Sequence, residues 1–236
     1  MRFKAIAMIA GVVLLMTAPA WATSFNYSFE NCGQISSTLG AGGACPGNLK
    51  TSGATYTAGG TSITAVGYQA GIGTTNLYVK KDGGDESGLG IANESDHEIA
   101  DNQIIQLNLT NLALAGITSG NLALGSVQTG EGYAIFTSNQ AGTLGSLELT
   151  GTLDDTGFPV TWTQSDPFIG ITAVDPNSSC DWNCGTNYHS DVLLVSLSAS
   201  TPTSPTPEPA SLALMGTGLL AIAFAVRKRF SLAKQN

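Results

Sequence analysis

Short segments in which every second residue is apolar recur along the chain, separated by glycine, asparagine, aspartate or proline. In residues 24–29, for example, Phe25, Tyr27 and Phe29 alternate with polar side chains. A period of two is typical of a β-strand with one buried face. On this pattern we predict strands at residues 24–29, 62–69, 76–80, 104–109, 122–127, 133–138, 147–153, 168–174 and 192–197.

The composition agrees with an all-β fold. Glycine, threonine, serine and asparagine are abundant, whereas only 11% of the residues are charged and those that build exposed helix faces are scarce. No strand–helix–strand rhythm is present. We therefore predict an antiparallel two-layer β-sandwich over residues 23–199, with a jelly-roll-like topology. The Gly-, Thr- and Ser-rich stretch at residues 36–60 is predicted to be a loop.

The N-terminal residues 1–22 have the features of a signal peptide. Arg2 and Lys4 precede an apolar run, and Ala20 and Ala22 form the small-x-small pattern that signal peptidase accepts. An uncleaved anchor is the alternative, but the apolar run of about a dozen residues is shorter than the roughly 20 that a spanning helix needs. We expect cleavage after Ala22 and export of the chain.

The composition changes abruptly after the predicted sandwich. Residues 200–209 are rich in proline, threonine and serine, and we predict an extended stalk that is either O-glycosylated or unmodified. Residues 210–226 are mainly apolar and are predicted to form a single transmembrane helix. Basic residues follow this segment, which predicts that residues 231–236 lie in the cytoplasm and the sandwich on the other side of the membrane.

Three features in this region occur in a fixed order: Pro207-Glu208-Pro209, the apolar segment, and the basic cluster Arg227-Lys228-Arg229. This order, over residues 206–230, resembles the PEP-CTERM sorting signal of Gram-negative bacteria. The resemblance implies cleavage near Pro209 by exosortase, a membrane protease. It implies an inner-membrane tether with the domain in the periplasm, then transfer to the cell surface or extracellular space, in association with exopolysaccharide. An ordinary single-pass anchor is the alternative.

The part of the chain expected to be exported is strongly acidic. Residues 23–199 contain only three basic residues, Lys50, Lys80 and Lys81, against 16 of the 17 acidic residues of the chain. Such a charge opposes binding to nucleic acid or to anionic lipid. It favours solubility outside the cell, and binding of divalent cations or cationic polymers is the alternative.

Four cysteines remain after export: Cys32, Cys45, Cys180 and Cys184. An even number in an oxidising compartment predicts two disulfides. The spacing suggests Cys32 with Cys45 and Cys180 with Cys184, although four cysteines permit three pairings. Zinc ligation is the alternative.

Carboxylates gather in the Gly-rich segment 82–101, which holds seven of the 17 acidic residues. Calcium prefers several oxygen ligands on a flexible loop, although the spacing here differs from that of an EF-hand. The candidate calcium ligands are Asp82, Asp85, Glu86, Asp96, Glu98 and Asp101. Two alternatives remain open: a Gly-rich hairpin with solvated carboxylates, and a catalytic pair formed by Asp85 or Glu86 with Glu98.

A second resemblance lies in the same segment. Gly88-Leu89-Gly90, followed by Glu98-Ile99, resembles an element that recurs among PEP-CTERM proteins whose exported part looks like a β-sandwich. That resemblance implies no known activity.

Few other residues suggest chemistry. The histidines are His97 and His189, and the neighbours of His189, Ser190 and Asp191, would point to opposite faces of a strand, so a nucleophilic triad is not expected. Trp182, between two cysteines, is a candidate carbohydrate contact.

Most of the other large aromatic side chains are expected in the core: Trp162, Tyr68, Tyr78 and Tyr188. Taken together, the sequence predicts a non-enzymatic surface or extracellular-matrix protein, and a secreted carbohydrate-active enzyme is the alternative.

Overall fold

The computed structural model describes residues 22–30, 34–35, 47–83, 86–152, 155–175, 190–201, 215–220 and 222–223. The chain divides into two units. Thr23–Thr201 carries the sheets, and Met1–Ala22 with Pro202–Asn236 forms the other unit. In the second unit, residues 215–220 and 222–223 are helical.

The predicted membrane helix at residues 210–226 lies mostly outside the described residues. Within the part of the chain that the structure describes, no helix is both long enough and apolar enough to cross a membrane. The transmembrane helix therefore stays a prediction.

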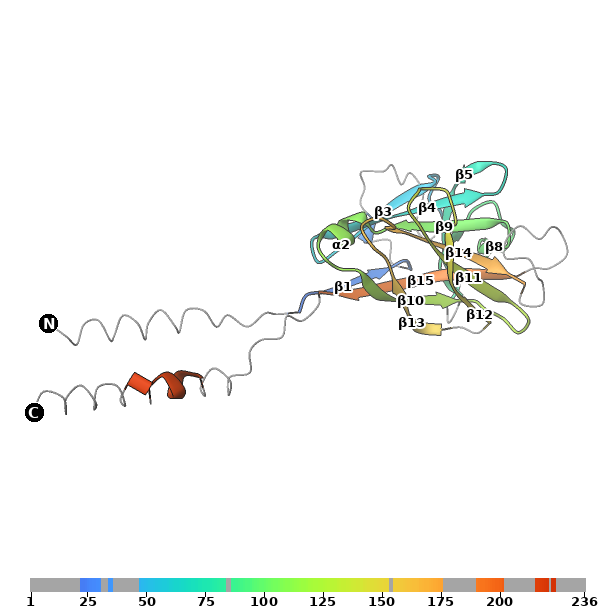
Figure 1. Ribbon diagram of the computed structural model, residues 1–236. Helices are drawn as coiled ribbons and strands as arrows, with labels where there is room; N and C mark the ends of the chain where they lie inside the picture. Colours follow the sequence, from blue (N-terminus) through green and yellow to red (C-terminus); the bar gives the residue numbers. More distant parts are fainter. Residues whose placement is uncertain are drawn as a thin grey trace, which may run out of the picture. The chain divides into compact units, whose positions relative to one another are not determined.

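The unit Thr23–Thr201 is built from two antiparallel sheets (Figure 1). The first sheet contains β1 (Ser24–Ser28), β2 (Gly47–Asn48), β6 (Leu77–Lys81), β7 (Ser87–Ile91), β8 (Ile99–Ala100), β10 (Ser119–Gly125), β13 (Asp155–Thr161) and β15 (Asp191–Ser200). The second contains β3 (Gly53–Ala58), β4 (Thr61–Gln69), β5 (Gly73–Thr75), β9 (Gln103–Asn108), β11 (Gly132–Ser138), β12 (Ser146–Gly151) and β14 (Phe168–Val174). The all-β, two-sheet prediction is confirmed.

The strand order is that of a jelly roll. The first sheet runs β13-β10-β15-β7-β6-β2, and the second runs β12-β11-β14-β9-β4-β3. Taken as eight successive strands, β7, β9 and β10–β15 form the two four-stranded arrays β13-β10-β15-β7 and β12-β11-β14-β9, as two nested Greek keys do. The strands β6 and β2 extend one sheet, and β4 and β3 extend the other.

The core between the sheets follows from the alternation of side chains along the strands. Tyr27 of β1 and Tyr56 of β3 are fully buried, and Trp162, directly after β13, is 2% exposed. Burying an apolar side chain of this size stabilises a fold by roughly 1.5–3 kcal/mol. The expected core position of Trp162 is confirmed, whereas Tyr68 and Tyr78 are only half-buried.

The predicted loop at residues 36–60 is wrong in part, because β2 and β3 lie within its described portion. In β3, Ala54 and Tyr56 face the core, and Tyr56 packs edge-on against Phe29 with ring centroids 4.8 Å apart. Threonine and glycine at the intervening positions hide this alternation in the sequence. Five further elements were not predicted: β5, β7, β8, β13 and the short helix α2 (Thr110–Leu114).

The first and the last strand of the sandwich lie side by side. β1 pairs with the last half of β15, from Ser24 opposite Ser200 to Ser28 opposite Ser196. Beyond the strands, the Thr23 amide donates to Thr201 Oγ1 at 2.9 Å, and the Thr201 amide donates to the Thr23 carbonyl oxygen at 2.9 Å. The chain therefore enters and leaves the sandwich at the same end.

Candidate functional site: a lysine between two glutamates

The outer face of the first sheet carries an unusual set of polar side chains on β6 and β7. Leu77 and Val79 of β6 are buried in the core, so Tyr78 and Lys80 lie on the opposite face. In β7, Gly90 pairs with Tyr78 and Gly88 pairs with Lys80. Glycine beside each large side chain leaves room for another segment to pack on this face.

That segment is the turn of residues 92–98. A Cβ on Gly90 would lie only 2.0 Å from the His97 carbonyl oxygen and 2.8 Å from Glu98 Cα, so the turn rests directly on the β7 backbone. A Cβ on Gly88 would lie 2.9 Å from the Leu194 carbonyl oxygen of β15. Close packing therefore requires glycine at positions 88 and 90. The same packing fixes the position of Glu98.

His97 anchors the turn from the other side. It has a φ of 63°, a left-handed conformation, and its ring stacks on Tyr78 with centroids 3.8 Å apart and an angle of 18° between the planes. The Ile91 amide donates to the Glu98 carbonyl oxygen at 3.2 Å, which closes the turn. These contacts direct the Glu98 side chain toward Lys80.

Four side chains meet there, and we call them the Lys80 cluster: Lys80, Glu86, Glu98 and Ser126. Lys80 Nζ donates to Glu86 Oε2 and to Glu98 Oε1, each at 2.5 Å. Ser126 Oγ lies 3.0 Å from Glu86 Oε1 and 2.9 Å from Glu98 Oε1. The hydroxyl has one hydrogen, so it donates to one of these two oxygens at a time.

The interior of the cluster is largely withdrawn from water. The Lys80 side chain is 12% exposed and that of Glu98 is 3% exposed, whereas that of Glu86 is 39% exposed. Glu98 Oε2 is buried and has no hydrogen-bond partner among the described residues. A buried carboxylate oxygen without a partner disfavours the charged form.

The pKa values of the two glutamates shift in opposite directions. Burial raises the pKa of Glu98 to about 7, although hydrogen bonds from Lys80 and Ser126 act in the opposite direction. The hydrogen bond from Lys80 lowers the pKa of Glu86 below its ordinary value. Burial alone would lower the pKa of Lys80, but its hydrogen bonds to both glutamates hold that pKa above its usual range.

A further carboxyl group adjoins the cluster from β15. Burial, together with a hydrogen bond and negative charge from Glu131, raises the pKa of Asp191 to about 7. The charge of Asp191 in turn contributes to the raised pKa of Glu98. The site therefore holds an excess of carboxyl groups around a single amine.

The structure describes five of the six candidate calcium ligands. Glu86 and Glu98 contact Lys80, Asp82 and Asp96 are exposed, Asp101 is half-buried, and Asp85 lies outside the described residues. Among the described residues, no group of three or more histidine, cysteine, aspartate or glutamate side chains is placed to hold a metal ion. With Asp85 undescribed, the calcium site stays a prediction.

The geometry bears on the predicted catalytic pair as well. Glycosidases hold two carboxyl groups roughly 5–10 Å apart with the sugar between them. Glu86 and Glu98 instead contact the same ammonium group and the same hydroxyl. Asp85, the other candidate partner of Glu98, lies outside the described residues, so the catalytic pair stays a prediction.

Lys80, Ser126 and Asp191 were not predicted as site residues. Ser126 reaches the cluster from the end of β10 with a φ of 64°, and no sequence signal marks it. The sequence contains a weak indication that Lys80 belongs to a site, because it is one of only three basic residues in the sandwich.

Several predicted site residues lie outside the described residues. They are Ala20, the four cysteines, Trp182, the Pro207-Glu208-Pro209 tripeptide and the Arg227-Lys228-Arg229 cluster. Ala22 is described and exposed. The disulfides and the carbohydrate contact at Trp182 therefore stay predictions.

Comparison with known proteins identifies the region after the sandwich. Residues 205–229 match a family model described as the PEP-CTERM protein-sorting motif. Neither a search of curated proteins nor a search of solved structures gave a match. The motif implies export by a signal-peptidase pathway, a membrane-anchored stage and exosortase processing. This chain is thus an exported β-sandwich protein that carries a PEP-CTERM sorting signal.

Proposed function

We propose that this chain is a non-enzymatic protein of the cell surface or extracellular matrix, delivered through its sorting motif and associated with exopolysaccharide. The observation that carries the proposal is the sorting motif at residues 205–229, which closely follows the last strand of the sandwich. The proposal places the intact sandwich outside the cell once the motif has been processed.

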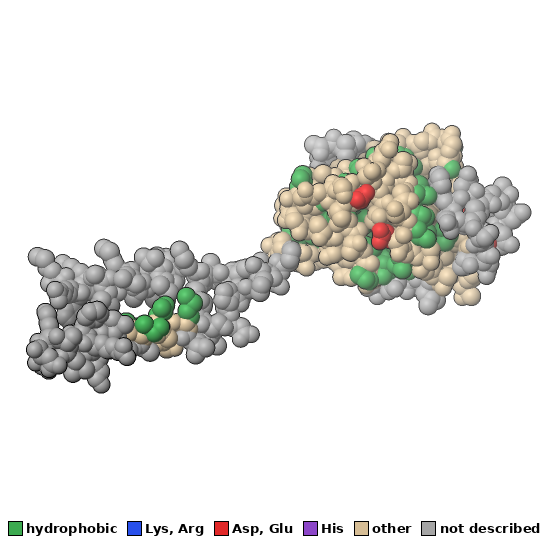
Figure 2. Space-filling view, viewed as in Figure 1, with side chains coloured by type: hydrophobic (Ala, Val, Ile, Leu, Met, Phe, Trp, Pro, Cys, Tyr) green, Lys and Arg blue, Asp and Glu red, His purple; other side chains and the backbone are tan. Residues whose placement is uncertain are grey.

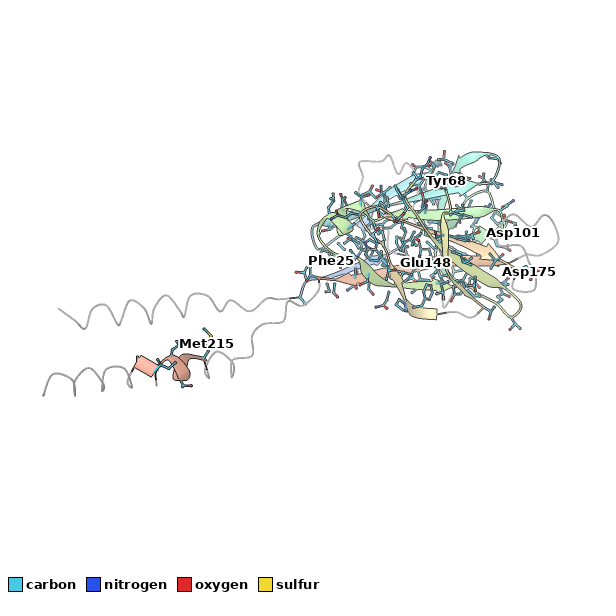
Figure 3. All side chains as sticks on the ribbon, viewed as in Figure 1. Phe25, Tyr68, Asp101, Glu148, Asp175 and Met215 are labelled. Carbon is cyan, nitrogen blue, oxygen red and sulfur yellow. The ribbon has the colours of Figure 1, made fainter. Side chains whose placement is uncertain are left out.

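The arrangement of the sandwich suits a tether at one end. Thr23 and Thr201 are hydrogen-bonded to each other where the chain enters and leaves. In Figure 3, Phe25 lies near this end, whereas Asp101 and Asp175 lie at the opposite end of the sheets. β15 has ten residues, so it separates Asp191 from Ser200 by roughly 30 Å. The tether would leave the end with the Lys80 cluster free to face outward.

The surface supports a binding role in a hydrated polymer. The face in Figure 2 consists largely of uncharged polar side chains and backbone, with acidic side chains at two places. Such a surface offers hydrogen bonds to hydroxyl groups. The engagement of Glu86 and Glu98 with Lys80 supports the non-enzymatic part of the proposal.

Replacing the tripeptide tests the sorting step. In the producing bacterium, Pro207→Ala combined with Glu208→Ala and Pro209→Ala should leave the full-length chain in the membrane fraction. The wild type should appear at the surface or in the medium with a lower mass. Pro202→Ala, in the same stalk, is the matched control and should be processed normally. Normal processing of the triple variant would contradict exosortase-dependent delivery.

Cosedimentation with purified exopolysaccharide tests the second step. The secreted protein should pellet with the polymer and leave its chain length unchanged over hours. Glu86→Gln and Glu98→Gln should alter neither result. Depolymerisation by the wild type that either variant abolishes, with binding retained, would favour the carbohydrate-active enzyme instead.

A further inference from the structure

Lys80 is a primary amine held against a carboxyl group in a site that is largely closed to water. Its Nζ lies 2.5 Å from Glu98 Oε1, and both side chains are mostly buried. Fixing two reactants in contact gives effective molarities far above any that free groups in solution can reach. An amine and a carboxylic acid held in this way can condense to an amide.

We propose that Lys80 and Glu98 form an intramolecular isopeptide bond, with Glu86 as the base and Ser126 as a hydrogen-bond donor to the retained oxygen. The bond would join β6 to the turn that precedes β8. The reaction consumes no cofactor and no oxidant, so the folded chain itself supplies every group.

Glu98 suits the role of the electrophile better than Glu86. It is the more buried of the two, and its Oε2 has no hydrogen-bond partner among the described residues. Burial also favours its neutral form, and a neutral carboxyl group is more readily attacked than a carboxylate. The unpartnered Oε2 is the oxygen that leaves.

Glu86 suits the role of the base. Its Oε2 already accepts a hydrogen bond from Lys80 Nζ, and the side chain is partly exposed, so its charged form is tolerated. A carboxylate that touches the ammonium group can take the proton that must be removed before the amine becomes nucleophilic.

The step balances within these three side chains. The Lys80 ammonium gives one proton to the Glu86 carboxylate, and the free amine attacks the carboxyl carbon of neutral Glu98. The nitrogen then loses a second proton, which leaves with the Glu98 hydroxyl group as one water molecule. The products are the Lys80–Glu98 amide, protonated Glu86 and water, and no net charge is gained or lost.

The surrounding structure holds the reactants in place. Gly90 lets residues 97 and 98 lie against β7, and the stacked rings of Tyr78 and His97 fix the adjoining turn. Ser126 Oγ, 2.9 Å from Glu98 Oε1, is placed to donate to the oxygen that becomes the amide carbonyl.

Mass spectrometry of the reduced and denatured full chain, isolated after export, tests the proposal. The wild type should be lighter by one water molecule than Lys80→Arg, after correction for the substitution, because arginine cannot form the amide. Glu86→Gln should retain the full mass in most molecules. Glu148→Gln, on β12 and away from the cluster, should show the same loss as the wild type.

Acetylation of the denatured chain gives a second measurement that does not depend on how any variant folds. In the wild type, peptide mapping should find Lys50 and Lys81 acetylated but Lys80 unreactive and joined to the peptide that contains Glu98. A wild-type chain with the full mass and an acetylated Lys80 would overturn the proposal. A water loss that persists in Lys80→Arg would overturn it equally.

Discussion

Gly90 lies so close to His97 that a Cβ at position 90 would be 2.0 Å from the His97 carbonyl oxygen. The neighbouring atoms belong to the backbone, which cannot move aside as a flexible side chain can. The close approach holds Glu98 against Lys80, so it connects a glycine in the sequence to the geometry of the polar cluster.

Gly90→Ala should therefore destabilise the sandwich by about 3 kcal/mol, the upper part of the range for overpacking. Chemical denaturation of the purified protein measures this value. Gly53→Ala is the matched control, since a Cβ there would meet its nearest atoms at 3.8 Å. The control should change the free energy of unfolding little, and equal losses in both variants would contradict the packing argument.

The glycine spacing also illustrates what the sequence could reveal. A strand such as β1 was predictable because one face is apolar and the other polar. In β7 all five residues are buried, because the core covers one face and the turn of residues 92–98 covers the other. Two of those residues are glycines, so the sequence shows neither alternation nor a hydrophobic run, and no strand is predicted there.

The cluster was only half predictable for a different reason. The sequence singles out Glu86 and Glu98 as candidate calcium ligands, with solvated carboxylates or a catalytic pair as alternatives. None of these hypotheses includes Lys80. Ser126, directly after β10, and Asp191 of β15 lie at the same cluster. A local sequence pattern cannot predict contacts between strands so distant in the sequence. Lys80 occupies an outward position of its strand, which in the sequence is typical of a solvated side chain.

Asp191 predicts a pH dependence of stability. Burial, Glu131 and Asp96 raise its pKa from 3.8 to about 7, and Lys80 acts against them. The folded state therefore binds a proton more tightly than the unfolded state does. The stabilisation is fully present below about pH 4 and is lost as the pH rises through 7.

Thermal unfolding across pH 5–8 measures this effect. From this group the wild type should lose a few degrees of Tm over the range, and Asp191→Asn should lose less. Asp82→Asn removes an exposed carboxylate instead and should keep the wild-type slope. A slope that Asp191→Asn leaves unchanged would show that another group is responsible.

Gln106 fastens a loop to the outer face of the second sheet. The Gln106 side chain is buried, with 3% of the residue exposed. Its Nε2 donates to the carbonyl oxygens of Thr143 at 2.9 Å and Gln140 at 3.3 Å. Its Oε1 accepts a hydrogen bond from the Gly142 amide at 2.8 Å. Gln106→Leu should cost about 3 kcal/mol, because three backbone groups lose their partner. Gln128→Leu makes the same change at an exposed side chain, so it is the matched control and should cost little. Denaturation curves for both variants provide the comparison, and equal costs would contradict this account.

Thr201 secures the end of the sandwich from which the chain continues toward the sorting motif. Its Oγ1 accepts a hydrogen bond from the Thr23 amide, and the contact is exposed, so Thr201→Val should cost no more than about 1 kcal/mol in global stability. The local effect should be larger, because β1 frays when its first hydrogen bond is lost. Hydrogen exchange of the β1 amides should therefore accelerate severalfold in Thr201→Val. Thr201→Ser retains the hydroxyl and should exchange as the wild type does. Acceleration in Thr201→Ser without acceleration in Thr201→Val would show that the methyl group, rather than the hydrogen bond, holds this end together.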